Sequence, residues 1–352
     1  MKLLNDTIQK ITKTDDAARA SAKKRLDQLT MPHWALGRLM DLAMDLAAIT
    51  GQSPPPVARK TIVTMAADHG VTEEGVSLYP QEVTAQMVYN FVNGGAGVNA
   101  LSGLTNAKVI VVDMGVKADL GPLEEKIMHK KIRAGSGNIG NGPAMTKEEA
   151  IRSVEAGIEV AQELASSTDV FGTGDMGIGN TTPSSAIIAA ITGVRPEEIT
   201  GRGTGIDDDQ LSRKVGIVKR ALEVNQVDKD DGLDVLAKVG GFEIGGIAGL
   251  ILGAASMNRP ALVDGFISTA GALVAATIAP LAKDYMIASH LSVEPGHSAM
   301  LGALGKRAYL DMNMRLGEGT GSALAMVLVE AASKVLTEIA TFEEAAVSQS
   351  DK

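Results

Sequence analysis

Short β-branched runs alternate with longer helical segments along most of the chain. The candidate strands, each followed by a polar residue or a glycine-containing turn, cover 61–67, 108–112, 169–171, 261–263 and 285–288. Strands that alternate with helices predict an α/β fold with a mostly parallel sheet flanked by helices. The carboxyl ends of such strands form one edge of the sheet, and ligands of open parallel sheets bind at that edge.

Both ends of the chain have a helical pattern instead. In residues 1–50 leucine and methionine recur at helical spacing, with a break at Met31-Pro32, and the proline-rich stretch 52–56 follows as a linker. Residues 322–347 also have helical periodicity, with an acidic end. Two apolar stretches, 245–257 and 266–282, are too short or too rich in Gly, Ala and Thr for membrane spans, so we expect buried helices there.

Composition narrows the classes of function. The 352-residue chain has a net charge of −9, which disfavours binding to nucleic acid or to an anionic membrane. It has no cysteine, which excludes disulfides, thiolate metal sites and a cysteine nucleophile. The N-terminal stretch turns polar too early for a signal peptide, so we expect a cytoplasmic protein.

Glycine clusters in three loops, at 135–140, 172–177 and 201–205. Two of them match the G-x-G-x-x-G pattern of dinucleotide-binding folds, but two matches in one chain show how unspecific that pattern is. The second loop also continues through Gly179, and we expect its helix to open only at 181–183, with Thr182 as the N-cap. The loops therefore serve either tight turns or the binding of a phosphate by backbone N–H groups.

Eight motifs occur in the order found in one enzyme family, and together they extend over roughly residues 60–325. The motifs are ADHGV (67–71), YPQEVT (79–84), GPAMT (142–146), GTGDMGIGNTT (172–182), GRGTGID (201–207), DGFI (264–267), SHLSVEPGH (289–297) and LGEGTG (316–321). On these motifs the chain resembles the nicotinate-nucleotide–dimethylbenzimidazole phosphoribosyltransferase family.

The resemblance implies a Rossmann-like large domain at 57–305 and a smaller helical domain built from both chain ends, at 1–56 and 306–352. It implies a homodimer without a cofactor. It also implies transfer of the 5-phosphoribosyl group from nicotinate mononucleotide to 5,6-dimethylbenzimidazole, a step of cobalamin nucleotide-loop assembly. The products of that transfer are α-ribazole 5′-phosphate and nicotinate.

This reaction needs one proton acceptor. The nicotinate ring of the donor is a pyridinium, which leaves as a neutral nitrogen without an acid or a metal ion. The benzimidazole attacks through one ring nitrogen and loses a proton from the other, so one carboxylate suffices as general base. The resemblance assigns that role to Glu318, flanked by Gly317 and Gly319; from the sequence alone a loop glutamate is more commonly exposed and inert.

The resemblance also implies the residues that bind the two substrates. For the acceptor pocket they are Gln86, Ser77, Tyr79, Met314 and Leu316. For the donor phosphate they are Gly174, Gly177, Gly203, Ser292 and Lys214. Without the resemblance, Gln86 fits a solvated helix face equally well, and Lys214 fits a surface lysine better.

Two positions depart from the family pattern. The segment 29–37 reads LTMPHWALG where the family usually reads L-T-K-P-x-G-S-L-G, so Met31 replaces a lysine. Asp175 stands where many members have a glutamate, and its shorter side chain reaches less far. We expect Asp175 to bind or polarise the substrate.

The histidines raise the question of a metal site. Glu294 and His297 have Glu-x-x-His spacing, but Pro295-Gly296 between them predicts a turn, which does not align two ligands as a helix does. We therefore expect no metal site and structural hydrogen bonds for His69, His290 and His297, although His69 and His290 remain candidates for the site wall. Two alternatives stay open: transfer to another lower-ligand base, such as adenine, another benzimidazole or a phenol, and a non-catalytic nucleotide-binding protein on the same fold.

Overall fold

A six-stranded parallel sheet forms the centre of the computed structural model, which describes residues 1–123 and 125–348. The strands are β1 (Lys60–Ala67), β2 (Lys108–Gly115), β3 (Met128–His129), β4 (Val170–Met176), β5 (Ala261–Val263) and β6 (Met286–Ala288). Their spatial order, β3-β2-β1-β4-β5-β6, is that of the doubly wound Rossmann fold. The α/β prediction is confirmed, and the direction of winding reverses between β1 and β4, where such folds bind ligands.

The strand β4 is longer than its sequence pattern predicted. Only 169–171 has a strand-like composition, whereas the structure extends the strand to Met176 through GTGD. Thr64 and Ala66 of β1 pair with Gly174 and Met176 in a continuous parallel ladder. Neighbouring strands, rather than intrinsic preference, hold this glycine-rich stretch extended.

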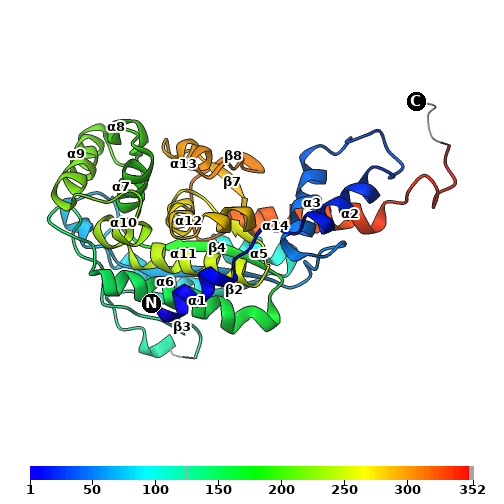
Figure 1. Ribbon diagram of the computed structural model, residues 1–352. Coiled ribbons are helices and arrows are strands. Elements are labelled where there is room, and N and C mark those ends of the chain that lie inside the picture. The colour runs from blue at the N-terminus through cyan, green and yellow to red at the C-terminus, as the bar shows by residue number, and fades with distance from the viewer. Residues whose placement is uncertain (124, 349–352) are drawn as a thin grey trace.

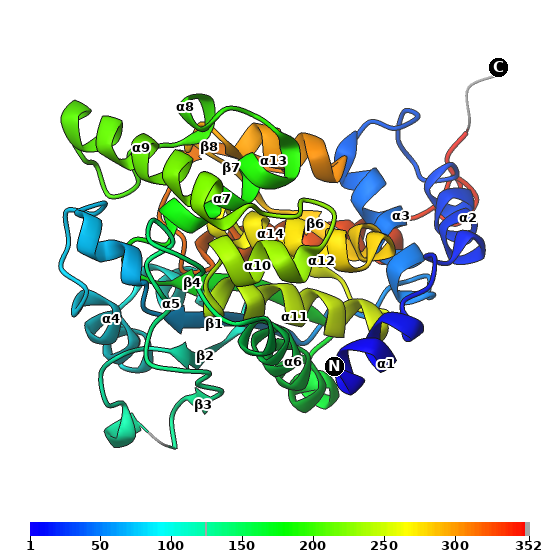
Figure 2. The same cartoon turned by 60° about the vertical axis from the view of Figure 1, so that its left-hand side comes forward.

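Helices cover both faces of the sheet (Figures 1 and 2). The helix α11 (Phe242–Ser256) packs on β1, β2 and β4 and against α6 (Lys147–Leu164). The helix α14 (Thr320–Glu338) packs on β1, β4 and β5. Along β1 the side chain of Met65 lies at Gly246 of α11, and that of Ile62 lies at Gly319, beside α14. Because positions 62 and 65 point to opposite faces of a strand, α11 and α14 lie on opposite sides of the sheet.

The remaining helices surround this core. They are α1 (Lys2–Lys10), α2 (Asp16–Leu26), α3 (Arg38–Thr50), α4 (Val83–Val92), α5 (Gly97–Ser102), α7 (Thr181–Thr192), α8 (Pro196–Ile199), α9 (Asp208–Asn225), α10 (Gly232–Val239), α12 (Phe266–Ile278) and α13 (His297–Leu304). A two-stranded parallel sheet, β7 (His290–Ser292) with β8 (Leu310–Met314), lies beside α13. Both apolar stretches, in α11 and α12, are buried helices as predicted.

The two chain ends meet in a projecting arm (Figure 1). Thr30 N donates to Ala340 O, and Phe342 N donates to Gln28 O, so the segment after α2 and the segment after α14 lie side by side. The helix α1 lies apart from this arm. It packs near α6 instead, and the amino group of Met1 contacts Glu155 of that helix. The division into domains at 56 and 305 stays a prediction, and residues 349–352 of its last segment lie outside the described residues.

Two helix boundaries differ from the sequence predictions. The last helix ends at Glu338; Thr341 forms an isolated bridge with Leu29 and residues 342–346 form a turn, although the periodicity of 339–347 looked helical. The helix α7 begins at Thr181, with Asn180 at the N-cap position and no side-chain cap, so Thr182 is not the N-cap. Backbone pairing between the chain ends draws 340–342 into an extended path that local periodicity does not encode.

The helix α14 is the one helix in residues 1–123 and 125–348 that is long and apolar enough to cross a membrane. Of its apolar window, 56% is buried within the protein. A buried core helix passes the same test of length and composition, so this is weak evidence for a membrane span.

Candidate active site

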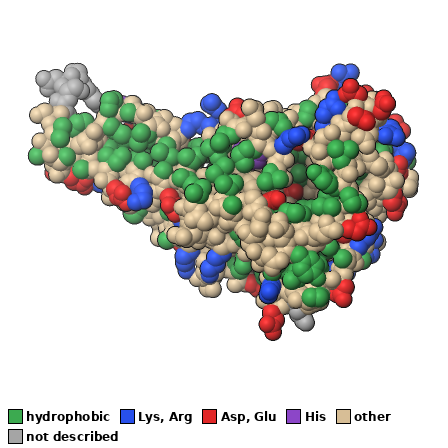
Figure 3. Space-filling model, turned by 180° about the vertical axis from the view of Figure 1, so that it is seen from behind, with side chains coloured by type: hydrophobic (Ala, Val, Ile, Leu, Met, Phe, Trp, Pro, Cys, Tyr) green, Lys and Arg blue, Asp and Glu red, His purple; other side chains and the backbone are tan. Residues whose placement is uncertain are grey.

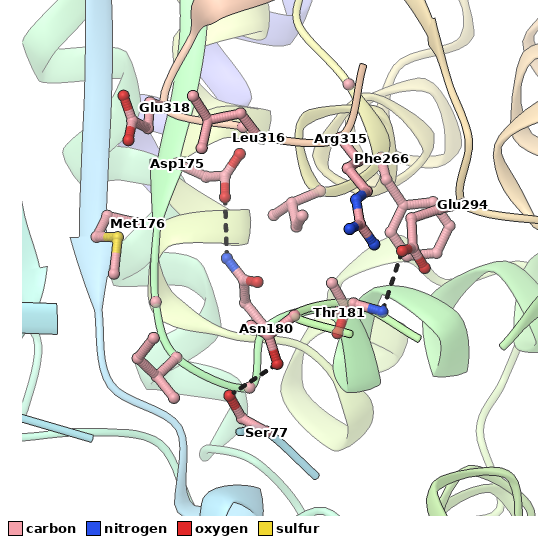
Figure 4. Close-up of a pocket in the computed structure, with 18 of the residues that line it drawn as sticks. Ser77, Asp175, Met176, Asn180, Thr181, Phe266, Glu294, Arg315, Leu316 and Glu318 are labelled. Carbon is pink, nitrogen blue, oxygen red and sulfur yellow. Dashed lines mark hydrogen bonds between the residues drawn. The ribbon is translucent and has the colours of Figure 1, made fainter. Parts of the chain in front are cut away.

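A cavity of about 630 Å³ lies at the carboxyl edge of β4, close to the point where the sheet order reverses. The residues that line it come from the β4–α7 loop, the start of α12, β7, and the loops before α4, α9 and α14. Eight residues predicted from the sequence line it: Ser77, Tyr79, Asp175, Gly177, Gly203, Ser292, Leu316 and Glu318. Figure 4 shows Asp175 and Glu318 at one side of the cavity, and Arg315, Phe266 and Glu294 at the other.

The loop that carries Glu318 has an unusual backbone. Gly317, Glu318 and Gly319 have φ angles of +81°, +64° and +102° in succession. Glycine adopts such angles readily, but Glu318 does so at a steric cost, and strain of this kind is concentrated at functional sites. Thr64 Oγ1 of β1 donates to Glu318 O at 2.8 Å, which ties the strained residue to the sheet.

The Glu318 carboxylate is held close to the sheet edge and is only 6% exposed. Val98 N of α5 donates to its Oε2 at 3.1 Å. Burial raises the pKa of the Glu318 carboxyl, and the N–H groups of Val98 and Gly97 oppose that rise. A carboxylate with a raised pKa is a stronger proton acceptor than an ordinary glutamate, which suits a general base.

Asp264, at the end of β5, anchors the first turn of α14. Its Oδ2 accepts from Gly319 N at 3.2 Å, and its Oδ1 accepts from Ser322 N at 3.0 Å. Burial raises the pKa of the Asp264 carboxyl to about 6, and the nearby His290 opposes the rise. The sequence showed Asp264 only as a strand-end residue; its role in fixing the Glu318 loop depends on a contact between residues more than fifty positions apart.

Asp175 faces the same loop from β4. Its Oδ2 accepts from Asn180 Nδ2 at 3.0 Å, and its carboxylate lies against Gly317. Burial, together with the negative charge of Asp264, raises the pKa of the Asp175 carboxyl well above its usual range. Asp175 and Glu318 thus share one side of the cavity.

The glycine loops approach the start of α7. Gly177 packs so closely on Ala67 O and the His69 ring that a Cβ would overlap both. Gly203 N donates to Glu294 Oε1 at 3.1 Å, so one of the predicted phosphate donors is already occupied by a carboxylate. At the start of α7, Asn180 N and Thr182 N already donate to Gly177 O and Gly179 O, and Pro183 has no N–H. Within residues 180–183, Thr181 N is therefore the one backbone donor that remains available to an anion.

Lys214 is not among the residues that line the cavity, and its contact with the phosphate stays a prediction. Its side chain is fully buried, and its Nζ donates to Thr181 Oγ1 at 2.7 Å and to Gly201 O at 3.0 Å. Burial lowers the pKa of the Lys214 ammonium to about 8, although Glu294 opposes this. The lysine therefore acts on the cavity through Thr181 and the 201–205 loop.

Three more predicted residues lie off the cavity wall. Gln86 is exposed on α4 and does not line the cavity, whereas Val83 and Met87 of the same helix do. Met314 ends β8, and its carbonyl accepts from Val293 N. Gly174 lies beneath the Glu318 backbone, where a Cβ would overlap the Glu318 carbonyl.

Several lining residues were missed by the sequence reasoning. Those with polar or aromatic side chains are Asn180, Thr181, Thr204, Phe266, Glu294 and Arg315. All lie inside or next to the family motifs, so proximity to a motif was the available signal. Their direction relative to the cavity depends on packing.

The histidines are mostly engaged in hydrogen bonds. His69 Nε2 lies 2.7 Å from Glu243 Oε1, and His297 bonds Thr269 Oγ1 and Ser292 N. His290 lines the cavity, and both of its buried ring nitrogens lack a hydrogen-bond partner within the structure. No group of three or more His, Asp or Glu side chains that could hold a metal ion occurs among the described residues. The absence of a metal requirement stays a prediction.

The model of a phosphoribosyltransferase family matches residues 11–347 of the chain, including every element that lines the cavity. The chain belongs to this phosphoribosyltransferase family. Nicotinate-nucleotide–dimethylbenzimidazole phosphoribosyltransferase from Syntrophotalea carbinolica is 58% identical over 351 residues, 99% of each chain. The protein of the same name from Desulfotalea psychrophila is 56% identical and covers both chains fully.

A solved member has the same fold. The crystal structure of the enzyme of this name from Thermus thermophilus superposes with a TM-score of 0.90 at 45% identity, covering 96% of this chain and 100% of that chain. The resemblance inferred from eight motifs is thereby confirmed, and so is the assignment to the phosphoribosyltransferases.

Proposed function

We propose that this phosphoribosyltransferase transfers the 5-phosphoribosyl group from nicotinate mononucleotide to 5,6-dimethylbenzimidazole, releasing nicotinate and α-ribazole 5′-phosphate. The observation that carries the proposal is the position of Glu318. Its backbone is strained, and its buried carboxyl has a raised pKa and lines the cavity. The start of α7 borders the same cavity. The names of the relatives that match over the whole chain support the same substrates.

The chemistry then assigns one role to Glu318. As the glycosidic bond breaks, the sugar carbon gains positive charge and the pyridinium leaves as a neutral ring. The benzimidazole nitrogen attacks that carbon, and the proton on its second nitrogen becomes acidic. The Glu318 carboxylate accepts this proton while Val98 N and Thr64 Oγ1 hold the residue in place.

The two ends of the cavity suit the two substrates. The wall that carries Glu318 also includes Met176 and Leu316, and Val83 and Met87 add to the apolar lining of the cavity, which suits a flat heteroaromatic acceptor. Thr181 N at the start of α7 suits the 5′-phosphate, and the helix dipole adds to its attraction.

Asp175 acts on the substrates as a positioning group. Burial and the neighbouring carboxylate of Asp264 disfavour its charged form, so it is a poor second base but a suitable hydrogen-bond donor when protonated. Asn180 fixes its direction.

The test is incubation of the purified protein with nicotinate mononucleotide and dimethylbenzimidazole, with free nicotinate and α-ribazole 5′-phosphate measured together. We expect equal amounts of both products. Adenine, another benzimidazole and a phenol are run as competing acceptors, because the pocket and not the motifs sets that choice. Hydrolysis without a ribosylated base would contradict the proposal, as would binding of the mononucleotide without any turnover.

We also propose a cytoplasmic homodimer that binds small molecules and no nucleic acid. The net charge of −9 opposes nucleic-acid binding. Figure 3 shows hydrophobic side chains gathered in a band across one face of the molecule, and large exposed apolar residues outside the cavity lining, such as Leu104, Met312 and Val327, support a surface covered by a second copy. Sedimentation at micromolar concentration tests the dimer, and a fully active monomer would refute it.

A further inference from the structure

Arg315 is the one Lys or Arg side chain among the described residues that line the cavity. The same wall contains three carboxylates, from Asp175, Glu294 and Glu318. Figure 4 shows the Arg315 guanidinium projecting into the cavity between the Asp175 side and the Glu294 side. No hydrogen bond or ion pair joins that guanidinium to another residue within 1–123 and 125–348. Its five N–H donors are therefore available to a ligand.

The surroundings of Arg315 are aromatic and apolar. Figure 4 shows Phe266 and Arg315 in the same part of the cavity, and Phe266 and Ile267 both line the cavity. A flat apolar ring next to a guanidinium suits a heteroaromatic ring that bears an anionic substituent. The start of α7, which offers Thr181 N and the positive end of the helix dipole, suits a phosphate instead.

We propose that Arg315 binds the carboxylate of the donor's pyridine ring and so selects pyridine-carboxylate donors over pyridine-carboxamide donors. This inference rests on the proposed function, whose donor carries such a carboxylate. Guanidinium and carboxylate match in a bidentate arrangement of two parallel hydrogen bonds. A carboxamide brings no charge and presents an NH₂ group to the N–H donors of Arg315, which leaves one of the two hydrogen bonds unmade.

The pairing also answers an electrostatic problem of the cavity. A pyridine carboxylate that enters the cavity comes close to the carboxyl groups of Asp175, Glu294 and Glu318. Each of these groups repels the ligand when it is ionised. The Arg315 cation, which faces Asp175 and Glu318 from the other side of the cavity, compensates for that repulsion and orients the ring at the same time. Arg315 precedes Leu316 and Glu318 in the chain, so one short loop contacts both the leaving ring and the acceptor.

The experiment compares two donors and three variants. The kcat/KM with dimethylbenzimidazole is measured for nicotinate mononucleotide and nicotinamide mononucleotide, using the wild type, Arg315→Gln, Arg315→Lys and Arg213→Gln. Arg213 lies exposed on α9 outside the cavity lining and serves as the control for loss of one positive charge. All four proteins are checked for unchanged folding by circular dichroism.

We expect Arg315→Gln to lower kcat/KM for nicotinate mononucleotide about 10- to 100-fold, the range for one charge-assisted hydrogen-bonding contact. The nicotinamide donor should change by less than about threefold, because it has no carboxylate to lose. Arg315→Lys should recover part of the preference, and Arg213→Gln should keep all of it. Equal losses with both donors would overturn the proposal, since Arg315 would then act on the ribose phosphate or on the loop itself.

A binding measurement tests the role of Arg315 independently of catalytic turnover. Calorimetry of free nicotinate and free nicotinamide with the wild type and Arg315→Gln should show that only nicotinate binding weakens. If the wild type makes no α-ribazole 5′-phosphate but still binds nicotinate through Arg315, the proposed function fails while this inference stands. If nicotinate binding is unchanged in Arg315→Gln, this inference fails while the proposed function stands.

Discussion

Gly174 of β4 lies directly beneath the carbonyl of Glu318, so closely that a Cβ at position 174 would overlap the carbonyl oxygen. The strained Glu318 loop therefore rests on a strand position that only glycine can occupy. Sequence reasoning placed Gly174 near the donor phosphate, but its contact is with the backbone of the candidate base. The strand and the loop lie more than 140 positions apart in the chain, and this contact joins them.

Gly174→Ala should displace Glu318 and lower kcat at least about tenfold, because small misplacements of a positioned group are costly to catalysis. Overpacking at this buried strand should also cost about 1–3 kcal/mol of stability. Gly216→Ala, on α9 with open space around its Cβ position, is the matched control and should leave both unchanged or gain slightly in stability. Steady-state kinetics and urea unfolding measure the two effects. A Gly174→Ala enzyme with wild-type kcat would mean that the position of Glu318 is not critical.

Glu318→Gln should lower kcat about 10²- to 10⁴-fold, the usual contribution of a positioned general base. The amide oxygen of glutamine still accepts from Val98 N, so the loop keeps its shape and both KM values should stay within about threefold. Asp175→Asn, which keeps an acceptor for Asn180, should cost less than Glu318→Gln in kcat. A loss below tenfold in Glu318→Gln would remove Glu318 from the mechanism and leave Asp175 as the next candidate.

Asp175→Asn should make the protein more stable at pH 8 than the wild type. The pKa of Asp175 is higher in the folded protein than in the unfolded chain. Asp175 therefore stabilises the folded state fully at a pH below its unfolded-state pKa, and this stabilisation is lost as the pH rises through its folded-state pKa. Asparagine cannot ionise, so the variant does not lose stability in this way. Its melting temperature should exceed that of the wild type by about 2 °C or more at pH 8. At pH 4 the two proteins should be nearly equal. Asp6→Asn on exposed α1 is the control, and a gain of the same size in that variant, or at both pH values, would contradict the assignment.

Nicotinate riboside should be a poor donor compared with nicotinate mononucleotide. Thr181 N and the helix dipole at the start of α7 lose their anion when the phosphate is absent, and a charge-assisted hydrogen bond contributes about 1.5–3 kcal/mol. We expect kcat/KM to fall on the order of 10²-fold or more. Equal kcat/KM values for the two donors, measured by nicotinate release, would show that the start of α7 and the glycine loops do not bind the phosphate.

The strands show where local pattern suffices. The β-branched runs in β1 and β2 and the short β5 could be predicted because their own residues favour extended, buried backbone. The second half of β4 could not, since GTGD is held extended only by its pairing with β1. The segment 339–347 looked helical but forms a bridge and a turn, because pairing with the segment after α2 determines its path.

Some residues of the candidate site could also be predicted from the sequence, and others could not. Glu318, Asp175, Gly177 and Ser292 could be found because they lie within ordered motifs, and the structure brings them to one cavity. Lys214 and Gln86 could not be placed, because a motif position does not tell whether a side chain points into a cavity, into the core or toward solvent. Arg315 was missed for the same reason.

The sequence by itself determined the alternation of strands and helices, the family, and the residue types that the chemistry requires. Those properties are local or are read from ordered motifs, so they need no knowledge of distant contacts. Only the tertiary structure decided that Asp264 fixes the Glu318 loop, that Gly174 supports it and that Lys214 is buried beneath Thr181. Each of these depends on packing between segments far apart in the chain, where close packing leaves room for a single arrangement.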